Sequence, residues 1–189
     1  MSLPRLLVLT DRSQCTGSLT ATVATAVDAG ARAVVLREKD LPVTERAGLA
    51  AGLRRLLDPV GGLLVCAGAG SGDAVHLAAG EPFPAPRPRL VGRSCHDAAE
   101  VEQAAGEGCD WVFVSPVFPT ASKPGHGPAL GPAGLGALVP LGPPVYALGG
   151  IGPDQVAGCR AAGAHGVAVM GGVMRDPGVV HDLLAALDG

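Results

Sequence analysis

The chain has 189 residues, 48% of which are hydrophobic, and it carries a formal net charge of -3 at pH 7. This length fits a single domain, and the hydrophobic content excludes wholesale disorder. Aromatic residues make up only 3% of the chain and no basic tract is present, which argues against a nucleic-acid-binding surface.

Short apolar runs alternate with longer, alanine-rich stretches along the chain. The apolar runs predict eight strands, at residues 6–9, 33–36, 62–66, 74–77, 90–92, 111–114, 145–148 and 166–170. Runs that are apolar throughout, without alternating polar residues, are typical of parallel strands covered on both faces.

The alanine-rich stretches predict helices at residues 18–29, 43–57, 97–107, 132–138, 153–162 and 177–187. Ser18 and Asp97 stand where a helix N-cap is preferred, and Pro153 stands in a first helical turn. Two crossovers are weak, because residues 67–73 are few and glycine-rich and residues 80–89 hold four prolines.

This alternation predicts a compact (β/α)8 TIM barrel, a single domain over residues 1–189 with weak or missing helices after the third and fourth strands. A doubly wound open sheet is the alternative. That fold would require a Gly-x-Gly-x-x-Gly turn after an early strand, whereas the first strand here leads into Thr10-Asp11-Arg12.

In a TIM barrel, the chemistry belongs to the loops that follow the carboxyl ends of the strands. Arg37 and Lys39 follow the second strand and, being two residues apart, face the same way. Two cations at the barrel mouth would attract a polyanion. Ion pairs of these cations with Glu38 and Asp40 are the alternative interpretation.

The sixth strand leads into a loop that is rich in anion-binding groups. Residues 112–131 read V-F-V-S-P-V-F-P-T-A-S-K-P-G-H-G-P-A-L-G. Thr120, Ser122 and Lys123 supply two hydroxyls and an ammonium group. We therefore predict that this loop closes over a phosphate or a pyrophosphate.

Two glycine pairs follow the last two strands, Gly149-Gly150 after the seventh and Gly171-Gly172 after the eighth. Glycine allows backbone N–H groups to approach a phosphate closely. The loops after the last two strands are also the usual phosphate site of a TIM barrel. Tight turns are the alternative interpretation of both pairs.

Two histidines are candidate proton carriers, since histidine titrates near neutral pH. His96 follows the fifth strand, where it could equally cap the next helix. His126 lies between glycines in the loop after the sixth strand, where it could simply be exposed. We interpret His76, within the fourth strand, as structural.

The sequence predicts a cytoplasmic location. No apolar run of about 18 residues predicts a membrane span, and the first residues lack the layout of a signal peptide. The five cysteines are scattered and form no C-x-x-C pair, which indicates reduced thiols.

A set of seven motifs resembles the thiamine phosphate synthase and thiazole tautomerase (TenI-like) superfamily over nearly the whole chain. In order, they are L-T-D-R, L-R-E-K-D, A-V-H-L, V-G-R-S-C-H-D, P-V-F-P-T-A-S-K, A-L-G-G-I and G-V-A-V-M. The resemblance implies a TIM barrel. In synthases of this family, an aminopyrimidine pyrophosphate loses diphosphate, a thiazole phosphate captures the carbocation, and magnesium with basic residues stabilises the diphosphate.

The resemblance also implies a role for individual residues. It assigns the diphosphate to basic and hydroxyl side chains, which are Arg37, Lys39, Thr120, Ser122 and Lys123. Ser94 would lie near the pyrimidine. Gly150 and the backbone near Gly171 would bind the thiazole phosphate.

Several positions depart from the family pattern. Val35 stands where synthases usually carry glutamine, and Val65-Cys66-Ala67 occupies the region of an Asn-Asp pair whose aspartate binds magnesium. A second metal-binding aspartate appears here as Glu81, a candidate ligand for Mg²⁺. Asp11 or Asp73 could replace the missing aspartate, although their spacing gives no support. The tautomerase branch needs no metal and carries a histidine just after the sixth strand, where this chain has Pro116.

The sequence favours a synthase-like transferase that acts on phosphorylated thiazole and pyrimidine substrates, because Lys39 and Lys123 suit a diphosphate. A TenI-like thiazole phosphate tautomerase, with His96 or His126 as its base, or a divergent family member is the second interpretation. A non-catalytic binder of thiazole phosphate or thiamine phosphate is the third. The sequence leaves open whether the chain forms a homo-oligomer.

Overall fold

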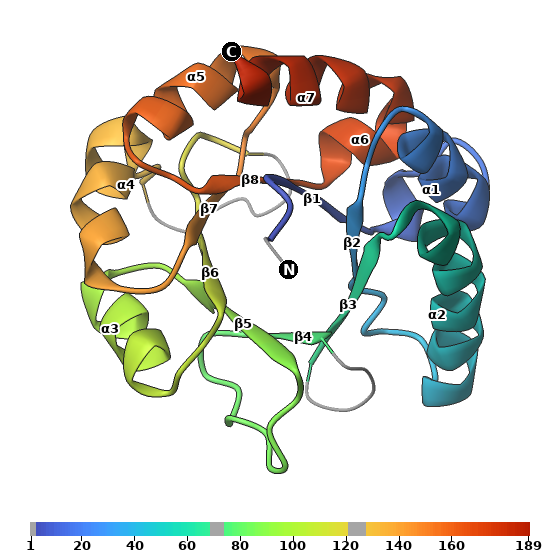
Figure 1. Ribbon diagram of the computed structural model, residues 1–189, viewed down its shortest axis with the longest axis horizontal. Coiled ribbons are helices and arrows are strands. Elements are labelled where there is room, and N and C mark those ends of the chain that lie inside the picture. The colour runs from blue at the N-terminus through green and yellow to red at the C-terminus, as the bar shows by residue number, and fades with distance from the viewer. Residues whose placement is uncertain (1–2, 69–73, 121–127) are drawn as a thin grey trace.

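Eight parallel strands close into a barrel in the computed structural model, which describes residues 3–68, 74–120 and 128–189 (Figure 1). The strands pair in chain order from β1 to β8, and β8 pairs with β1 through Leu6 and Val167. This closure confirms the predicted TIM barrel and excludes the doubly wound sheet.

The strand bounds agree closely with the apolar runs. They are β1 (Leu6–Leu9), β2 (Ala33–Leu36), β3 (Leu63–Ala67), β4 (Ala74–Leu77), β5 (Leu90–Cys95), β6 (Trp111–Val114), β7 (Val145–Leu148) and β8 (Gly166–Val169). The prediction that the fifth strand ends at Gly92 is wrong. It continues because Arg93 pairs with Leu77 of β4 and Ser94 pairs with Phe113 of β6.

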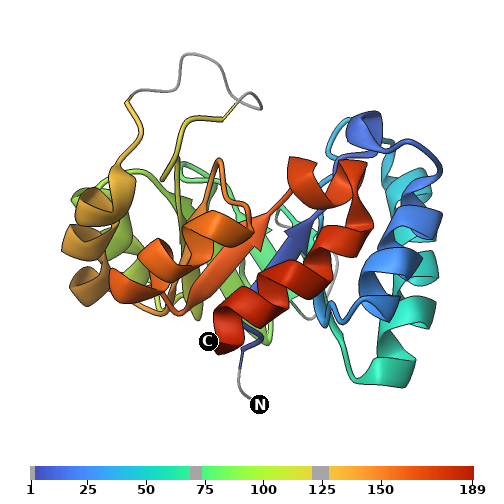
Figure 2. The same ribbon diagram turned by 90° about the horizontal axis from the view of Figure 1, so that it is seen from above.

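The helices lie outside the strands (Figure 2). They are α1 (Leu19–Asp28), α2 (Val43–Leu57), α3 (Ala98–Gly106), α4 (Gly131–Leu138), α5 (Pro153–Ala161), α6 (Gly171–Arg175) and α7 (Val180–Asp188), with 3-10 turns η1 (Arg12–Gln14), η2 (Asp58–Val60), η3 (Val139–Leu141) and η4 (Pro177–Val179). The side chains of Ser18 and Asp97 accept N-cap hydrogen bonds, as predicted. The sequence did not predict α6, because its first two residues are glycines.

The crossovers around β4 differ from the other βα units. Residues 78–89, between β4 and β5, contain no helix, in keeping with their four prolines. The crossover from β3 to β4 falls largely in residues 69–73, outside the described residues. None of the helices that the structure describes is long and apolar enough to cross a membrane.

Alternate strand residues fill the barrel interior, since successive side chains of a strand point to opposite faces. The interior cluster consists of Leu7, Leu9, Ala33, Val35, Val65, Ala74, Trp111, Phe113, Tyr146 and Ala168. The residues between them, such as Val8 and Val34, pack against the helices. Val35, which stands in place of the family's glutamine, therefore adds an apolar group to the interior.

Gly92 makes room for the largest interior side chain. A Cβ atom built at Gly92 would lie 2.1 Å from the Trp111 ring, a distance at which the ring would have to move. Trp111 is fully buried. The indole therefore occupies the space that a side chain at position 92 would need.

Arg93 is a structural residue that faces away from the interior, although it belongs to the polar end of β5. Its side chain is 1% exposed and pairs with Glu107 at 2.6 Å. Its Nη1 donates to the carbonyls of Ala78, Ala79 and Glu81 at 3.0, 2.8 and 2.7 Å. The guanidinium therefore supports the turn that follows β4.

We expect the substitution Gly92→Ala to lower the free energy of unfolding by about 1–3 kcal/mol, because overpacking displaces neighbouring side chains. Urea unfolding measures the change. Gly48→Ala is the matched control, since Gly48 lies within α2 with no atom within 4 Å of a built Cβ. That control should leave stability unchanged or raise it by about 0.5–1 kcal/mol. Equal effects at both positions would contradict the packing argument.

Candidate active site

A cavity of about 320 Å³ opens at the carboxyl ends of the strands. Its volume falls in the range of small-molecule sites. Leu9, Phe113 and Leu148 form apolar parts of its wall, and residues that follow β1, β2, β5, β6, β7 and β8 supply polar groups. The cavity therefore lies at the end of the barrel where the sequence places the chemistry.

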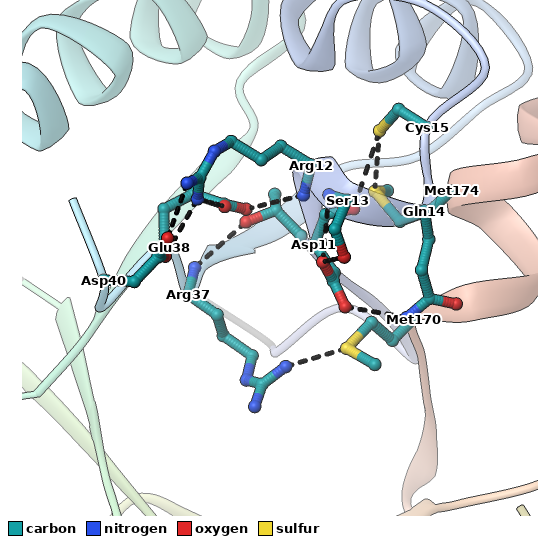
Figure 3. Close-up of polar contacts among 11 residues, drawn as sticks. Asp11, Arg12, Ser13, Gln14, Cys15, Arg37, Glu38, Asp40, Met170 and Met174 are labelled. Carbon is teal, nitrogen blue, oxygen red and sulfur yellow. Dashed lines mark hydrogen bonds and ion pairs between the residues drawn. The ribbon is translucent and has the colours of Figure 1, made fainter. Parts of the chain in front are cut away.

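Two cations reach the cavity from the end of β2. The guanidinium of Arg37 extends towards Met170, which follows β8, and its Nη1 lies 2.7 Å from the Met170 sulfur (Figure 3). Lys39 lies on the other side, with its Nζ 3.5 Å from Glu81 Oε2. Both side chains line the cavity, so the structure brings the two predicted cations to one rim.

Glu38 and Asp40 pair with Arg12 (Figure 3), whereas Lys39 pairs with Glu81. The Arg12 Nη1 lies 2.9 Å from Glu38 Oε2 and 2.8 Å from Asp40 Oδ1. Hydrogen bonding from Arg12 lowers the pKa of the Asp40 carboxyl below its usual value. The alternative interpretation of Arg37 and Lys39 as partners of these carboxylates is therefore wrong.

Asp11 also lines the cavity, although its spacing in the sequence supported no role for it. Its Oδ1 accepts hydrogen bonds from the Ser13 hydroxyl at 2.6 Å and the Ser13 amide at 3.1 Å, and its Oδ2 accepts one from Gln14 at 2.7 Å. The Ser13 hydroxyl is the largest cause of the lowered pKa of Asp11. The position of Asp11 directly after β1, in L-T-D-R, was the available signal.

Ser94 and the buried His76 form a polar pair in the cavity wall. His76 Nε2 lies 2.9 Å from Ser94 Oγ, and the imidazole stacks on Phe113 with ring centroids 3.9 Å apart. Burial is the main cause that lowers the pKa of His76 to about 3, with the charges of Lys39 and Arg37 adding to it. His76 is therefore neutral near pH 7 and helps to orient the Ser94 hydroxyl.

His96 contacts the loop after β6. Its Nδ1 lies 2.6 Å from the Ser115 carbonyl, to which it must donate because a carbonyl only accepts. The Glu100 carboxylate accepts the backbone N–H of His96 at 2.6 Å. In the neutral ring, Nε2 is then the basic nitrogen. His96 and Ser115 both line the cavity, and the sequence had not singled out Ser115 as a partner.

Three of the four candidate phosphate-binding glycines line the cavity, namely Gly149, Gly150 and Gly171. Gly150 has a φ of +65° and a built Cβ would lie 2.4 Å from the Pro119 carbonyl oxygen. Only glycine fits that position. Gly172 follows Gly171 in the first turn of α6 and is absent from the cavity wall that the structure describes.

Only part of the loop after β6 can be placed. Thr120 lines the cavity. Ser122, Lys123 and His126 lie outside the described residues, so their contribution to the site stays a prediction.

The described residues fit a magnesium site poorly, because magnesium uses one or two carboxylates beside the substrate phosphates and the candidate carboxylate here is paired with a lysine. In residues 3–68, 74–120 and 128–189, no three His, Cys, Asp or Glu side chains gather as metal ligands would. Glu81, the candidate ligand, has its Oε2 beside the Lys39 ammonium and accepts the Ala78 N–H at 3.0 Å. The end of β3 carries Ala67 and Gly68, which have no carboxylate, and Asp73 lies outside the described residues.

Neutral His76 predicts a loss of stability in acid. An unfolded histidine titrates near 6.5, so below that pH the unfolded chain binds a proton that folded His76 does not bind until about pH 3. The stability that depends on neutral His76 is complete above pH 6.5 and falls from there to about pH 3. Between pH 7 and pH 5 the loss should be about 2 kcal/mol.

Urea unfolding of the wild type and of His76→Gln at both pH values measures this contribution. The variant should lose about 2 kcal/mol less than the wild type between pH 7 and pH 5. An NMR titration in which the His76 ring changes its charge between pH 6 and 7 would contradict the assignment.

Comparisons with known proteins identify the family of the chain. A family model described as thiamine monophosphate synthase matches residues 6–173. A curated relative from Geobacter sulfurreducens is 39% identical over 186 residues, which cover 91% of this chain and 87% of the relative. The thiamine-phosphate synthase of Moorella thermoacetica is 35% identical over 163 residues, which cover 79% and 77% of the two chains.

A solved structure supports the same assignment. The thiamine phosphate pyrophosphorylase of Pyrococcus furiosus superposes with a TM-score of 0.84 at 26% identity, covering 97% of this chain and 95% of its own. With the family match and the two relatives, this similarity shows that the chain belongs to the thiamine monophosphate synthase family.

Proposed function

We propose that the chain couples an aminopyrimidine pyrophosphate to a thiazole phosphate and releases thiamine phosphate and pyrophosphate. One observation carries the proposal. The cavity presents cations at the end of β2 and glycine backbone after β7 and β8, with apolar side chains in the wall between them. Two anionic groups on two small ring substrates match this arrangement.

The cations would act on the bond that breaks. The electron pair of the C–O bond leaves with the diphosphate, and the thiazole nitrogen donates an electron pair to the methylene carbon that remains. Arg37 and Lys39 would stabilise the negative charge that develops on the leaving diphosphate, an effect that is strong in a site shielded from water. No proton has to move in this exchange.

Ser94 would orient the pyrimidine. Its hydroxyl is held at 2.9 Å by His76 Nε2, and His76 stays neutral because burial lowers its pKa. A neutral imidazole can exchange hydrogen-bond donor and acceptor roles with a hydroxyl. The Ser94–His76 pair would therefore present a fixed polar group to the ring without placing a further positive charge beside the carbocation.

Replacing the Arg37 guanidinium tests the proposed coupling. We expect Arg37→Gln to lower kcat/KM for thiamine phosphate formation about a hundredfold, since it removes a charge that stabilises the leaving group. The assay supplies both substrates with magnesium. Arg55→Gln on the exposed side of α2 is the control and should keep wild-type activity. Absence of thiamine phosphate above background in the wild type would refute the synthase proposal.

A second candidate function rests on His96. Its Nδ1–H···O bond to Ser115 leaves Nε2 as the base, at the edge of the cavity beside Pro116. A base at this place would suit proton transfer on a thiazole phosphate, as in a TenI-like tautomerase.

Incubation with the thiazole phosphate tautomer alone distinguishes this second function. If it holds, His96→Gln should slow isomerisation by about a hundredfold or more, whereas thiamine phosphate formation should not depend on that base. Tight binding of the thiazole phosphate without turnover in either assay would instead favour a non-catalytic binder.

A further inference from the structure

We infer that this chain binds the diphosphate with side-chain cations alone, and that Glu81 positions Lys39 where a metal carboxylate would otherwise act. The inference rests on the proposed function in one respect, since it takes a diphosphate as the ligand of Arg37 and Lys39, the two cations that follow β2. It concerns Glu81 and Lys39, whose ion pair the coupling reaction by itself does not explain.

Hydrogen bonds within the turn and from the buried Arg93 fix the backbone of the turn that carries Glu81. The Glu81 amide donates to the Ala78 carbonyl at 3.1 Å, and the buried Arg93 donates to the carbonyls of both residues. Arg93 is in turn fixed by its ion pair with Glu107. The position of the Glu81 backbone is therefore fixed by hydrogen bonds to Ala78 and to the buried Arg93.

The Glu81 carboxylate accepts hydrogen bonds from donors that belong to the protein itself. Its Oε2 accepts the Ala78 N–H at 3.0 Å and lies 3.5 Å from the Lys39 ammonium. A metal ion bound to this oxygen would stand next to a like charge. The carboxylate therefore suits a cation that is part of the protein.

Gly68 supports this interpretation from the end of β3. A Cβ built at Gly68 would lie 3.3 Å from Glu81 Oε1 and 3.9 Å from the Nζ of Lys39. A larger side chain there, such as a carboxylate, would crowd the ion pair. The space beside Gly68 is instead bordered by the Glu81–Lys39 pair itself.

Lys39 remains available to a ligand despite this contact. The side chains of Lys39 and Glu81 are 49% and 23% exposed, and ion pairs at such exposure contribute little to stability. Asp11, a carboxylate in the cavity wall, accepts hydrogen bonds from Ser13 and Gln14. An incoming diphosphate can therefore bind both Lys39 and Arg37 without losing a strong existing interaction.

Calorimetric titration with inorganic pyrophosphate tests the inference, in EDTA and in excess magnesium, with the free anion concentration corrected for its magnesium complex. We expect wild-type affinities in the two buffers to agree within threefold. Lys39→Gln should weaken binding at least tenfold in both buffers, and Lys39→Arg should recover most of the loss. Binding that requires magnesium, or is tenfold tighter with it, would overturn the inference.

The substitution Glu81→Gln distinguishes three possible roles of the Glu81 carboxylate, which are to position Lys39, to bind a metal ion, or only to repel the anion. Removing a negative charge beside an anion site should tighten binding if Glu81 only repels the anion, and should weaken it only in magnesium if Glu81 is a metal ligand. A positioning role predicts that binding weakens threefold or more in both buffers alike. Either of the other two results would overturn the inference.

Glu102→Gln on the exposed side of α3 is the matched control and should bind as the wild type does. Thermal melting checks that each variant is folded. Metal-free pyrophosphate binding without thiamine phosphate formation would refute the proposed coupling and leave the inference supported, so the two failures are distinguishable.

Discussion

Filling the inside of the closed barrel is the constraint on which the rest of the structure depends. Trp111, Phe113 and Tyr146 from β6 and β7 are the largest side chains of that interior, while other strands contribute small residues such as Ala33 and Ala168. Gly92 has to lack a side chain because the Trp111 ring takes its place. Large side chains on some strands and small ones on others fill the closed barrel with few aromatic residues. Phe113 also lines the cavity, where His76 stacks on its ring.

The distribution of charge at the barrel mouth follows from that closure. Because parallel strands end at one rim, β2 delivers Arg37 and Lys39 to the same opening, while Glu38, 4% exposed, faces the other way and pairs with Arg12. The chain that follows β2 thus separates the cations from the carboxylates of the same short segment. The cavity therefore carries positive charges that the carboxylates next to them in the sequence do not neutralise. An anionic substrate requires such charges.

Much of the fold and part of the site could be predicted from sequence. The bounds of β1, β2, β4, β6 and β7 follow directly from apolar runs. The extension of β5 could not be predicted, because Arg93 is a polar residue whose burial depends on carbonyls of the turn after β4 and on Glu107. The Ser94–His76 pair was equally hidden, since the two residues stand in different strands and meet only across the β4–β5 pairing.

The sequence by itself determined the barrel, its eight strands and the set of groups at their carboxyl ends, because hydrophobic periodicity and residue type are local properties. Only the tertiary structure decided how those groups are paired. Lys39 contacts Glu81 and Arg37 contacts Met170, although both cations stand beside carboxylates in the chain. Pairing depends on which side chains the closed barrel brings within a few ångströms of one another, and that distance is set by strand register and packing.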